Sequence, residues 1–151
     1  MSDMRELYQE QMRDHDKNPR NFHALGAANR VAHGHNTSCG DQFTVYVKLA
    51  DGIIEDIGFQ GVGCRISKSS ASMMTAELKG KTLAEAEALF AKFREMLAGE
   101  EELEEAEVES LGKLAVFSGV REYPARVKCA SLAWHTLHAA LENNDNSVST
   151  E

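Results

Sequence analysis

The chain has 151 residues, of which 42% are apolar, and its formal net charge is -8 at pH 7. This length and composition predict a single domain, residues 1–151, with a hydrophobic core of its own. The sequence contains no run of 18 apolar residues and no concentrated basic stripe, so we expect neither a membrane protein nor a nucleic-acid-binding protein. The N-terminal segment lacks the basic-then-apolar order of a signal peptide, and we therefore expect a cytoplasmic location.

The first half of the chain changes from a helical to a strand-like pattern. Apolar residues at helical spacing between residues 3 and 16 predict an amphipathic helix, which the pair Asn18-Pro19 ends. Two β-type runs, at 44–49 and 53–59, flank a turn at 50–52 and predict an antiparallel hairpin. A weaker run near 29–33 supplies a third strand.

The second half of the chain is helical. A helix over 67–79 ends at Gly80, and Thr82 with Glu85 forms a capping box that opens the next helix. The last helix begins at Pro124 and carries an apolar stripe that includes Trp134. Together these elements predict an α+β fold in which a small antiparallel three-stranded sheet packs against helices.

Two segments fall outside this pattern. Seven of the 24 acidic residues form one block between positions 100 and 109, which we interpret as a solvated helix face or mobile insertion. The residues after Asn143 are polar, and we expect a disordered tail at about 144–151.

Each of the three cysteines lies where a thiolate is readily presented. Cys39 falls in a glycine-containing loop before a strand, Cys64 at a strand-to-helix junction, and Cys129 in the first turns of the last helix. The partial positive charge of a helix N-terminus stabilises a thiolate, and we therefore expect the thiolates of Cys64 and Cys129 to be stabilised in the same way. Asp41 lies two residues after Cys39, and alternation along the start of a strand would place both residues on the same side.

Three thiolates and one carboxylate make a tetrahedral ligand set suited to zinc. The cysteines are 25 and 65 residues apart, however, and this spacing matches no compact zinc finger. From the residues alone, three interpretations stay open: a metal site, incidental buried cysteines, and one reactive thiol.

Several motifs occur together in an order typical of one family. They are Leu7-Tyr8 through His15, Lys17-Asn18-Pro19-Arg20-Asn21, Cys39-Gly40-Asp41, Gly61-Val62-Gly63-Cys64-Arg65-Ile66-Ser67, Ser69-Ser70-Ala71-Ser72-Met73-Met74-Thr75, and Gly119 to Ala130 with Arg121-Glu122-Tyr123-Pro124 and Lys128-Cys129. On these motifs the chain resembles the IscU-like (NifU N-terminal-like) iron-sulfur cluster assembly family over about residues 4 to 142.

Two features favour the SufU branch of that family. IscU-type scaffolds have a histidine immediately before the third cysteine, and this chain has Lys128 there. SufU-type proteins also carry an insertion before the last helix, and the acidic block with the segment after it, about 99–118, fills that place. A direct cluster-scaffold role is correspondingly less expected.

The resemblance implies a site and its partners. Cys39, Asp41, Cys64 and Cys129 match the zinc ligands, and Cys39 matches the thiol that receives sulfur from a SufS-type cysteine desulfurase. Arg126 is expected to pair with Asp41 or to stabilise the freed thiolate. Downstream iron-sulfur assembly proteins are the other implied partners.

The sequence therefore predicts a zinc-bound persulfide acceptor in iron-sulfur cluster assembly. The alternative from the same resemblance is a scaffold on which the cysteines hold an iron-sulfur cluster. A zinc hydrolase such as a deaminase is a third class, but the chain lacks the His-x-Glu and Pro-Cys-x-x-Cys patterns of deaminases.

Overall fold

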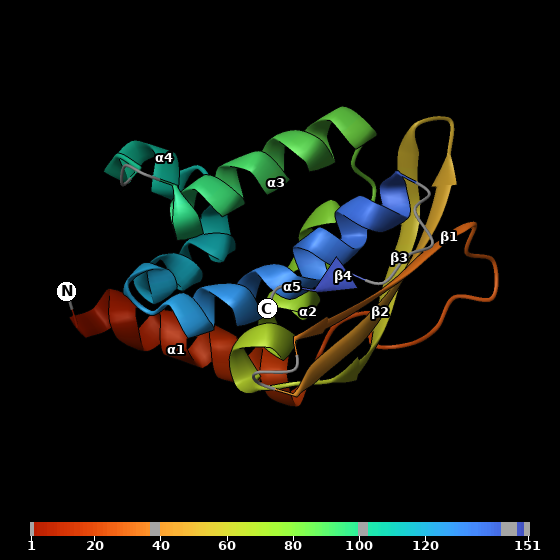
Figure 1. The fold of residues 1–151 in the computed structure, drawn as a ribbon. Coiled ribbons are helices and arrows are strands. Elements are labelled where there is room, and N and C mark those ends of the chain that lie inside the picture. The colour runs from red at the N-terminus through yellow and green to blue at the C-terminus, as the bar shows by residue number, and fades with distance from the viewer. Residues whose placement is uncertain (1, 37–39, 100–102, 143–147, 150–151) are drawn as a thin grey trace.

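The computed structural model describes residues 2–36, 40–99, 103–142 and 148–149. A sheet forms one layer of the molecule and helices form the other (Figure 1). The predicted α+β fold is confirmed. The elements in chain order are α1 (Ser2–Lys17), β1 (Arg30–Asn36), β2 (Asp41–Ala50), β3 (Ile53–Val62), α2 (Arg65–Leu78), α3 (Leu83–Ala98), α4 (Glu105–Glu109), the 3-10 helix η1 (Gly112–Glu122), α5 (Pro124–Leu141) and β4 (Val148–Ser149).

The sheet has the strand order β3-β2-β1-β4, and its three longer strands are antiparallel neighbours, as predicted. Asp51 and Gly52 join β2 to β3 with φ values of 53° and 74°, and positive φ at both turn residues matches the twist of a hairpin. β2 begins at Asp41, and the pairing of β1 with β2 sets Asn36 opposite Asp41. The metal-binding residue predicted at position 41 is thus the first residue of a strand.

The predicted disordered tail is corrected in part. Val148 and Ser149 form β4, which pairs in parallel with Gly34 and His35 of β1. Composition does not reveal this pairing, because an edge strand offers backbone N–H and C=O groups that any extended segment can satisfy. Residues 143–147 and 150–151 of the tail lie outside the described residues.

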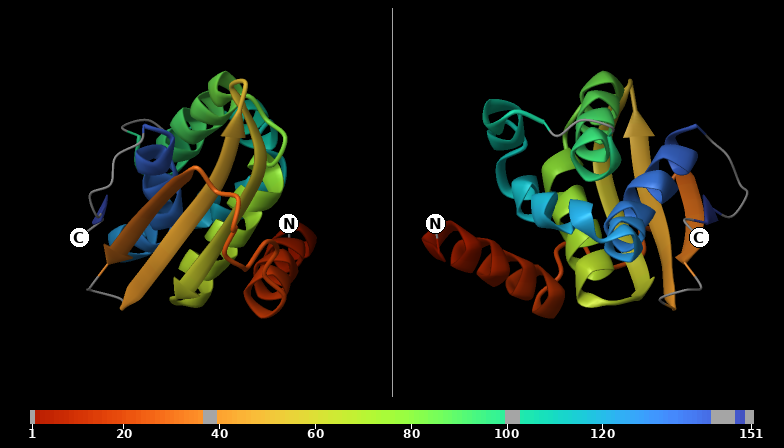
Figure 2. Two further views of the ribbon diagram at one scale, coloured as in Figure 1. Left: turned by 90° about the vertical axis from the view of Figure 1, so that its right-hand side faces the viewer. Right: turned by 60° about the vertical axis from the view of Figure 1, so that its left-hand side comes forward.

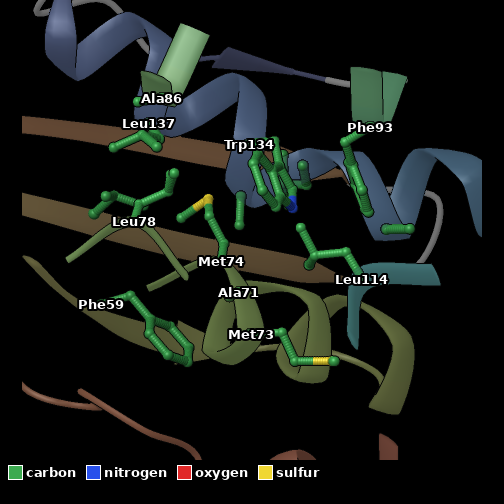
Figure 3. Close-up of a cluster of buried hydrophobic side chains, with 14 of the residues drawn as sticks. Phe59, Ala71, Met73, Met74, Leu78, Ala86, Phe93, Leu114, Trp134 and Leu137 are labelled. Carbon is green, nitrogen blue, oxygen red and sulfur yellow. The ribbon is translucent and has the colours of Figure 1, made fainter. Parts of the chain in front are cut away.

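The core lies between the sheet and the helices α2 and α5. Alternate residues of β2, Phe43, Val45 and Val47, are buried on this side. Figure 3 shows Trp134 and Leu137 of α5 next to the methionine and leucine side chains of α2. Each fully buried side chain of this size contributes about 1.5–3 kcal/mol to the free energy of unfolding. Met73 and Met74 of α2 are both buried in this core.

The insertion at about 99–118 is only partly a solvated segment. The described members of the acidic block, Glu104, Glu105, Glu107 and Glu109, are exposed, whereas residues 100–102 lie outside the described part of the chain. The following residues are core: Leu111, Leu114, Phe117 and Val120 are buried, and they recur every third residue through η1. A 3-10 helix has three residues per turn, so this spacing forms one apolar face. The insertion therefore contributes an exposed acidic segment and a set of buried core residues.

Helix α1 joins the body through a buried polar contact. Figure 2 shows α1 at the margin of the molecule, with its N-terminal end projecting from the other helices. Near its C-terminal end, His15 is buried, and its Nδ1 lies 2.7 Å from the hydroxyl of Ser72 on α2. The same hydroxyl accepts the backbone N–H of Arg20 at 2.8 Å. His15 belongs to the first of the family-like motifs, and its contact with Ser72 ties α1 to α2.

Acid should weaken this contact. Burial, with the positive charge of Arg20, lowers the pKa of His15 from 6.5 to about 4. Because the folded-state pKa is the lower one, the unfolded chain binds more protons between pH 6.5 and 4, so stability is complete above that window and falls within it. Between pH 7.5 and 5 we expect this residue to remove about 2 kcal/mol from the free energy of unfolding. Urea unfolding of the wild type and of His15→Gln at pH 7.5 and pH 5 measures this loss of unfolding free energy. An equal fall in both proteins would contradict the prediction.

Candidate metal centre

Three predicted ligands converge at one end of the domain. Asp41 begins β2, Cys64 immediately precedes α2, and Cys129 lies in α5. One ligand atom from each side chain lies within 4.8 Å of those of the other two. Within the described residues this is the only such group of three or more His, Cys, Asp or Glu side chains. The fold therefore brings together residues that are far apart in the sequence.

Cys64 is the N-cap residue of α2. Its Sγ accepts the backbone N–H of Ser67 at 3.4 Å, and its side chain is half-buried. The N-terminus of a helix carries partial positive charge, so this position stabilises a thiolate. The expected placement of Cys64 is confirmed.

Asp41 is fully buried, at 0% exposure, and its two oxygens have different surroundings. Oδ1 accepts the backbone N–H of Cys64 at 3.0 Å. Oδ2 is buried and has no hydrogen-bond partner in the described part of the structure. A buried carboxylate oxygen without a partner is costly, and a bound cation would satisfy it. One oxygen thus orients Cys64, and the other is available as a candidate ligand.

Cys129 is buried and is the sixth residue of α5. The effect of a helix N-terminus falls off within the first turn, so the help expected for Cys129 is smaller than that for Cys64 and stays a prediction. Its Sγ instead accepts a long hydrogen bond, 3.9 Å, from the side-chain amide of Asn36. Sequence reasoning missed this contact. The sequence did hold a signal for this contact. The inward-facing positions of β1 carry Ala32, Gly34 and then the polar Asn36.

A buried hydrogen-bond chain fixes α5 against α2. Trp134 Nε1 donates to Ser70 Oγ at 3.2 Å, and Ser70 Oγ donates to the carbonyl of Ala130 at 2.5 Å. Ala130 follows Cys129, while Ser70 lies in the helix that Cys64 caps. The separation between the two cysteines is therefore set by packed, hydrogen-bonded helices.

The donor set fits zinc. In a tetrahedral zinc site the metal lies about 2.3 Å from sulfur and about 2.0–2.2 Å from a carboxylate oxygen, which places the ligand atoms roughly 3.5–3.8 Å apart. The present limit of 4.8 Å requires only a small inward movement of the side chains. Cys39, the fourth predicted ligand, lies outside the described residues, so its participation stays a prediction.

Arg126 lies on the solvent side of α5. Its guanidinium carbon is 4.5 Å from the ring centroid of Tyr123, and both side chains are exposed. Among the described residues no ion pair joins Arg126 to Asp41. The suggested pairing is therefore absent from this conformation, and stabilisation of a freed thiolate stays a prediction.

Gly63 allows the close packing of this site. A Cβ at Gly63 would lie 2.8 Å from Cζ of Phe43 and 2.9 Å from Oδ1 of Asp41, so Gly63→Ala should displace the carboxylate. We expect zinc affinity to fall at least about tenfold, because metal sites commonly lose this much when a residue that holds a ligand in place is changed. The free energy of unfolding should fall by about 1–3 kcal/mol, because the added methyl group overpacks the site.

Gly26→Ala is the matched control, because nothing lies within 4 Å of a Cβ at that position. Competition with a chromophoric chelator measures the zinc affinity, and urea unfolding measures the stability. Equal zinc affinity of the Gly63 and Gly26 variants would contradict the role given to Gly63.

Comparison with known proteins identifies the family. The sequence model of the NifU-like N-terminal domain matches residues 7–130. The chain belongs to this family. The predicted resemblance to IscU-like and SufU-type iron-sulfur assembly proteins is confirmed. No described helix is both long and apolar enough to cross a membrane.

Three similar proteins show the range of the family. The zinc-dependent sulfurtransferase SufU of Bacillus subtilis (strain 168) is 38% identical over 139 residues, covering 92% of each chain. The iron-sulfur cluster assembly scaffold protein IscU of Streptococcus pyogenes serotype M1 is 38% identical, covering 97% of this chain and 90% of its own. A candidate cluster assembly scaffold of the SUF system from Fervidobacterium islandicum AW-1 has a crystal structure with a TM-score of 0.79 at 36% identity, covering 87% of this chain and 94% of its own.

Proposed function

We propose that this protein is a zinc-bound persulfide acceptor, which receives sulfur from a SufS-type cysteine desulfurase during iron-sulfur cluster assembly. The observation that carries the proposal is the convergence of Asp41, Cys64 and Cys129 with a buried, unpartnered carboxylate oxygen among them. The similarity to a relative named as a zinc-dependent sulfurtransferase supports the choice of metal and reaction.

The transfer step assigns Cys39 as the nucleophile. Its thiolate attacks the terminal sulfur of the desulfurase persulfide, a new S–S bond forms at Cys39, and the S–S bond on the desulfurase breaks to leave a cysteine thiolate there. When bound, zinc keeps the ligand thiolates deprotonated and out of disulfides. The chain's own contribution is to hold Cys64 and Cys129 in fixed positions, so that the site persists while Cys39 reacts.

An oxygen ligand beside three soft sulfur ligands is the weakest point of the set, which would make Asp41 the place where a partner's side chain enters. The structure buries this residue completely, whereas the Cys64 side chain is half-buried. A partner's side chain would reach the Asp41 position only after the surrounding residues move. We therefore propose that partner contact first takes place on the exposed side of the site.

Exposed side chains a few residues from Cys64 and Cys129 suit contact with a protein partner. Val62, two residues before Cys64, is 65% exposed, and Tyr123, at the start of α5, is 48% exposed. The exposed guanidinium of Arg126 lies over the Tyr123 ring. Tyrosine and arginine are enriched among the residues that anchor protein interfaces, so Tyr123 and Arg126 are candidates for contact with the desulfurase, and exposed Val62 adds apolar surface near Cys64.

The alternative is a scaffold that holds an iron-sulfur cluster with the same cysteines, and it is favoured by the relatives named as scaffolds. Metal and sulfide analysis of protein purified from cells separates the two functions. We expect about one zinc per chain and a colourless protein. Iron with acid-labile sulfide and a brown colour would favour the scaffold instead.

A further inference from the structure

Asn36 is a polar residue in an apolar position. It is the last residue of β1, it faces the helices, and its exposure is 0%. Two residues earlier, a Cβ at Gly34 would lie 2.0 Å from Oγ1 of Thr136 on α5, so the strand packs directly on that helix. This close approach brings the Asn36 amide to 3.9 Å from the Sγ of Cys129.

The amide is only half-satisfied by these surroundings. Its N–H group donates to the Cys129 sulfur, while its Oδ1 is buried without a partner in the described part of the structure. Burial of a partly unsatisfied amide is unfavourable, so fold stability alone gives no reason for an asparagine here. The pairing of β1 with β2 also sets Asn36 opposite Asp41, beside a second candidate ligand.

An N–H donor next to a metal-binding sulfur has a definite effect. A thiolate accepts a shorter and stronger hydrogen bond than a thiol, because the acceptor is charged. Such a bond fixes the position of the ligand, and loss of a supporting contact of this kind commonly lowers metal affinity about 10- to 100-fold. Cys64 differs, since it is half-buried and its described N–H donor is the backbone of Ser67.

We propose that Asn36 is a positioning residue of the metal centre. It donates to Cys129 and keeps that sulfur as the fixed ligand, so sulfur exchange takes place at another thiol of the site. This inference rests on the proposed function. It also gives the three cysteines unequal roles, with Cys129 as the anchor.

Two variants remove the donor with little change of volume. Asn36→Leu and Asn36→Val each replace the amide by an apolar group, and neither introduces a new metal ligand. Gln42→Leu is the matched control, because Gln42 lies next to Asp41 on the exposed face of the sheet. Zinc affinity is measured by chelator competition. Alkylation of each cysteine at saturating zinc is then followed by peptide mass spectrometry.

We expect both Asn36 variants to bind zinc about 10- to 100-fold more weakly, with Gln42→Leu unchanged. Alkylation of Cys129 should become at least about tenfold faster, while that of Cys64 changes much less. Zinc affinity and Cys129 alkylation within twofold of the wild type would overturn the proposal. Equal acceleration at every cysteine would also overturn it, because general loosening of the fold explains that result.

A measurement on the unaltered protein covers the case in which the variants do not fold. In protein loaded with an NMR-active cadmium isotope, the side-chain N–H of Asn36 should show a scalar coupling to the metal through the Cys129 sulfur. A loaded protein without this coupling would overturn the proposal. Failure of the wild type to bind zinc or cadmium would contradict the proposed function itself, which separates the two outcomes.

Discussion

Replacement of the sulfur at position 39 should abolish sulfur acceptance without unfolding the protein. In Cys39→Ser the described ligands Asp41, Cys64 and Cys129 remain available for zinc, but a hydroxyl cannot form the persulfide. After incubation with desulfurase and cysteine, the wild type should gain about 32 Da, one sulfur atom, and the variant should gain nothing. Mass spectrometry measures the adduct, and circular dichroism verifies the fold. An adduct on Cys64 or Cys129 of the variant would refute the assignment of Cys39 as acceptor.

The contrasting substitution is at Asp41. Asp41→Ala would leave the backbone N–H of Cys64 without its acceptor, so Asp41→Asn is the cleaner variant, because its oxygen can keep that hydrogen bond. The three thiolates should still hold zinc in this variant, and sulfur acceptance should weaken rather than disappear. Complete loss of the adduct in a folded, zinc-loaded Asp41→Asn protein would show that the carboxylate itself takes part in transfer.

Removal of the metal should lower the thermal stability by a large amount. Bound zinc would link β2, the start of α2, and α5, and it would bind the folded chain in preference to the unfolded one. At free zinc about 1,000 times the dissociation constant, this adds about 4 kcal/mol, which is roughly 10 °C in Tm for a domain of this size. Calorimetry before and after chelation, with metal content verified, measures the change. An unchanged Tm after complete removal would contradict the role of zinc in the fold.

Local signals explain how much of the fold could be predicted. The capping box of Thr82 and Glu85 is present, with each residue's side chain accepting the other's backbone N–H. The hairpin turn at 50–52 and the start of α5 at Pro124 also appear as predicted. Each depends on residues within a few positions of one another. The apolar residues that recur every third position in η1 were also a local signal. They follow the acidic block, however, and the whole segment was therefore interpreted as one solvated insertion.

The site was less predictable, because its contacts are made between elements. Spacing alone left the metal interpretation open, and the resemblance to the family selected Asp41, Cys64 and Cys129. Neither source indicated that Asn36 lies beside Cys129, since 93 residues separate them and only the packing of β1 on α5 brings them together. The burial of Asp41 and the stacking of Arg126 on Tyr123 likewise depend on the folded chain.

Zinc-dependent sulfur acceptance should be visible in the turnover of the desulfurase. Cysteine conversion by a SufS-type desulfurase is measured with no addition, with the zinc-loaded protein, with the zinc-stripped protein, and with stripped protein after zinc is restored. We expect faster turnover with the zinc-loaded protein, loss of that stimulation on stripping, and recovery when zinc returns. Equal turnover in all four conditions, with metal content verified, would contradict zinc-dependent sulfur acceptance.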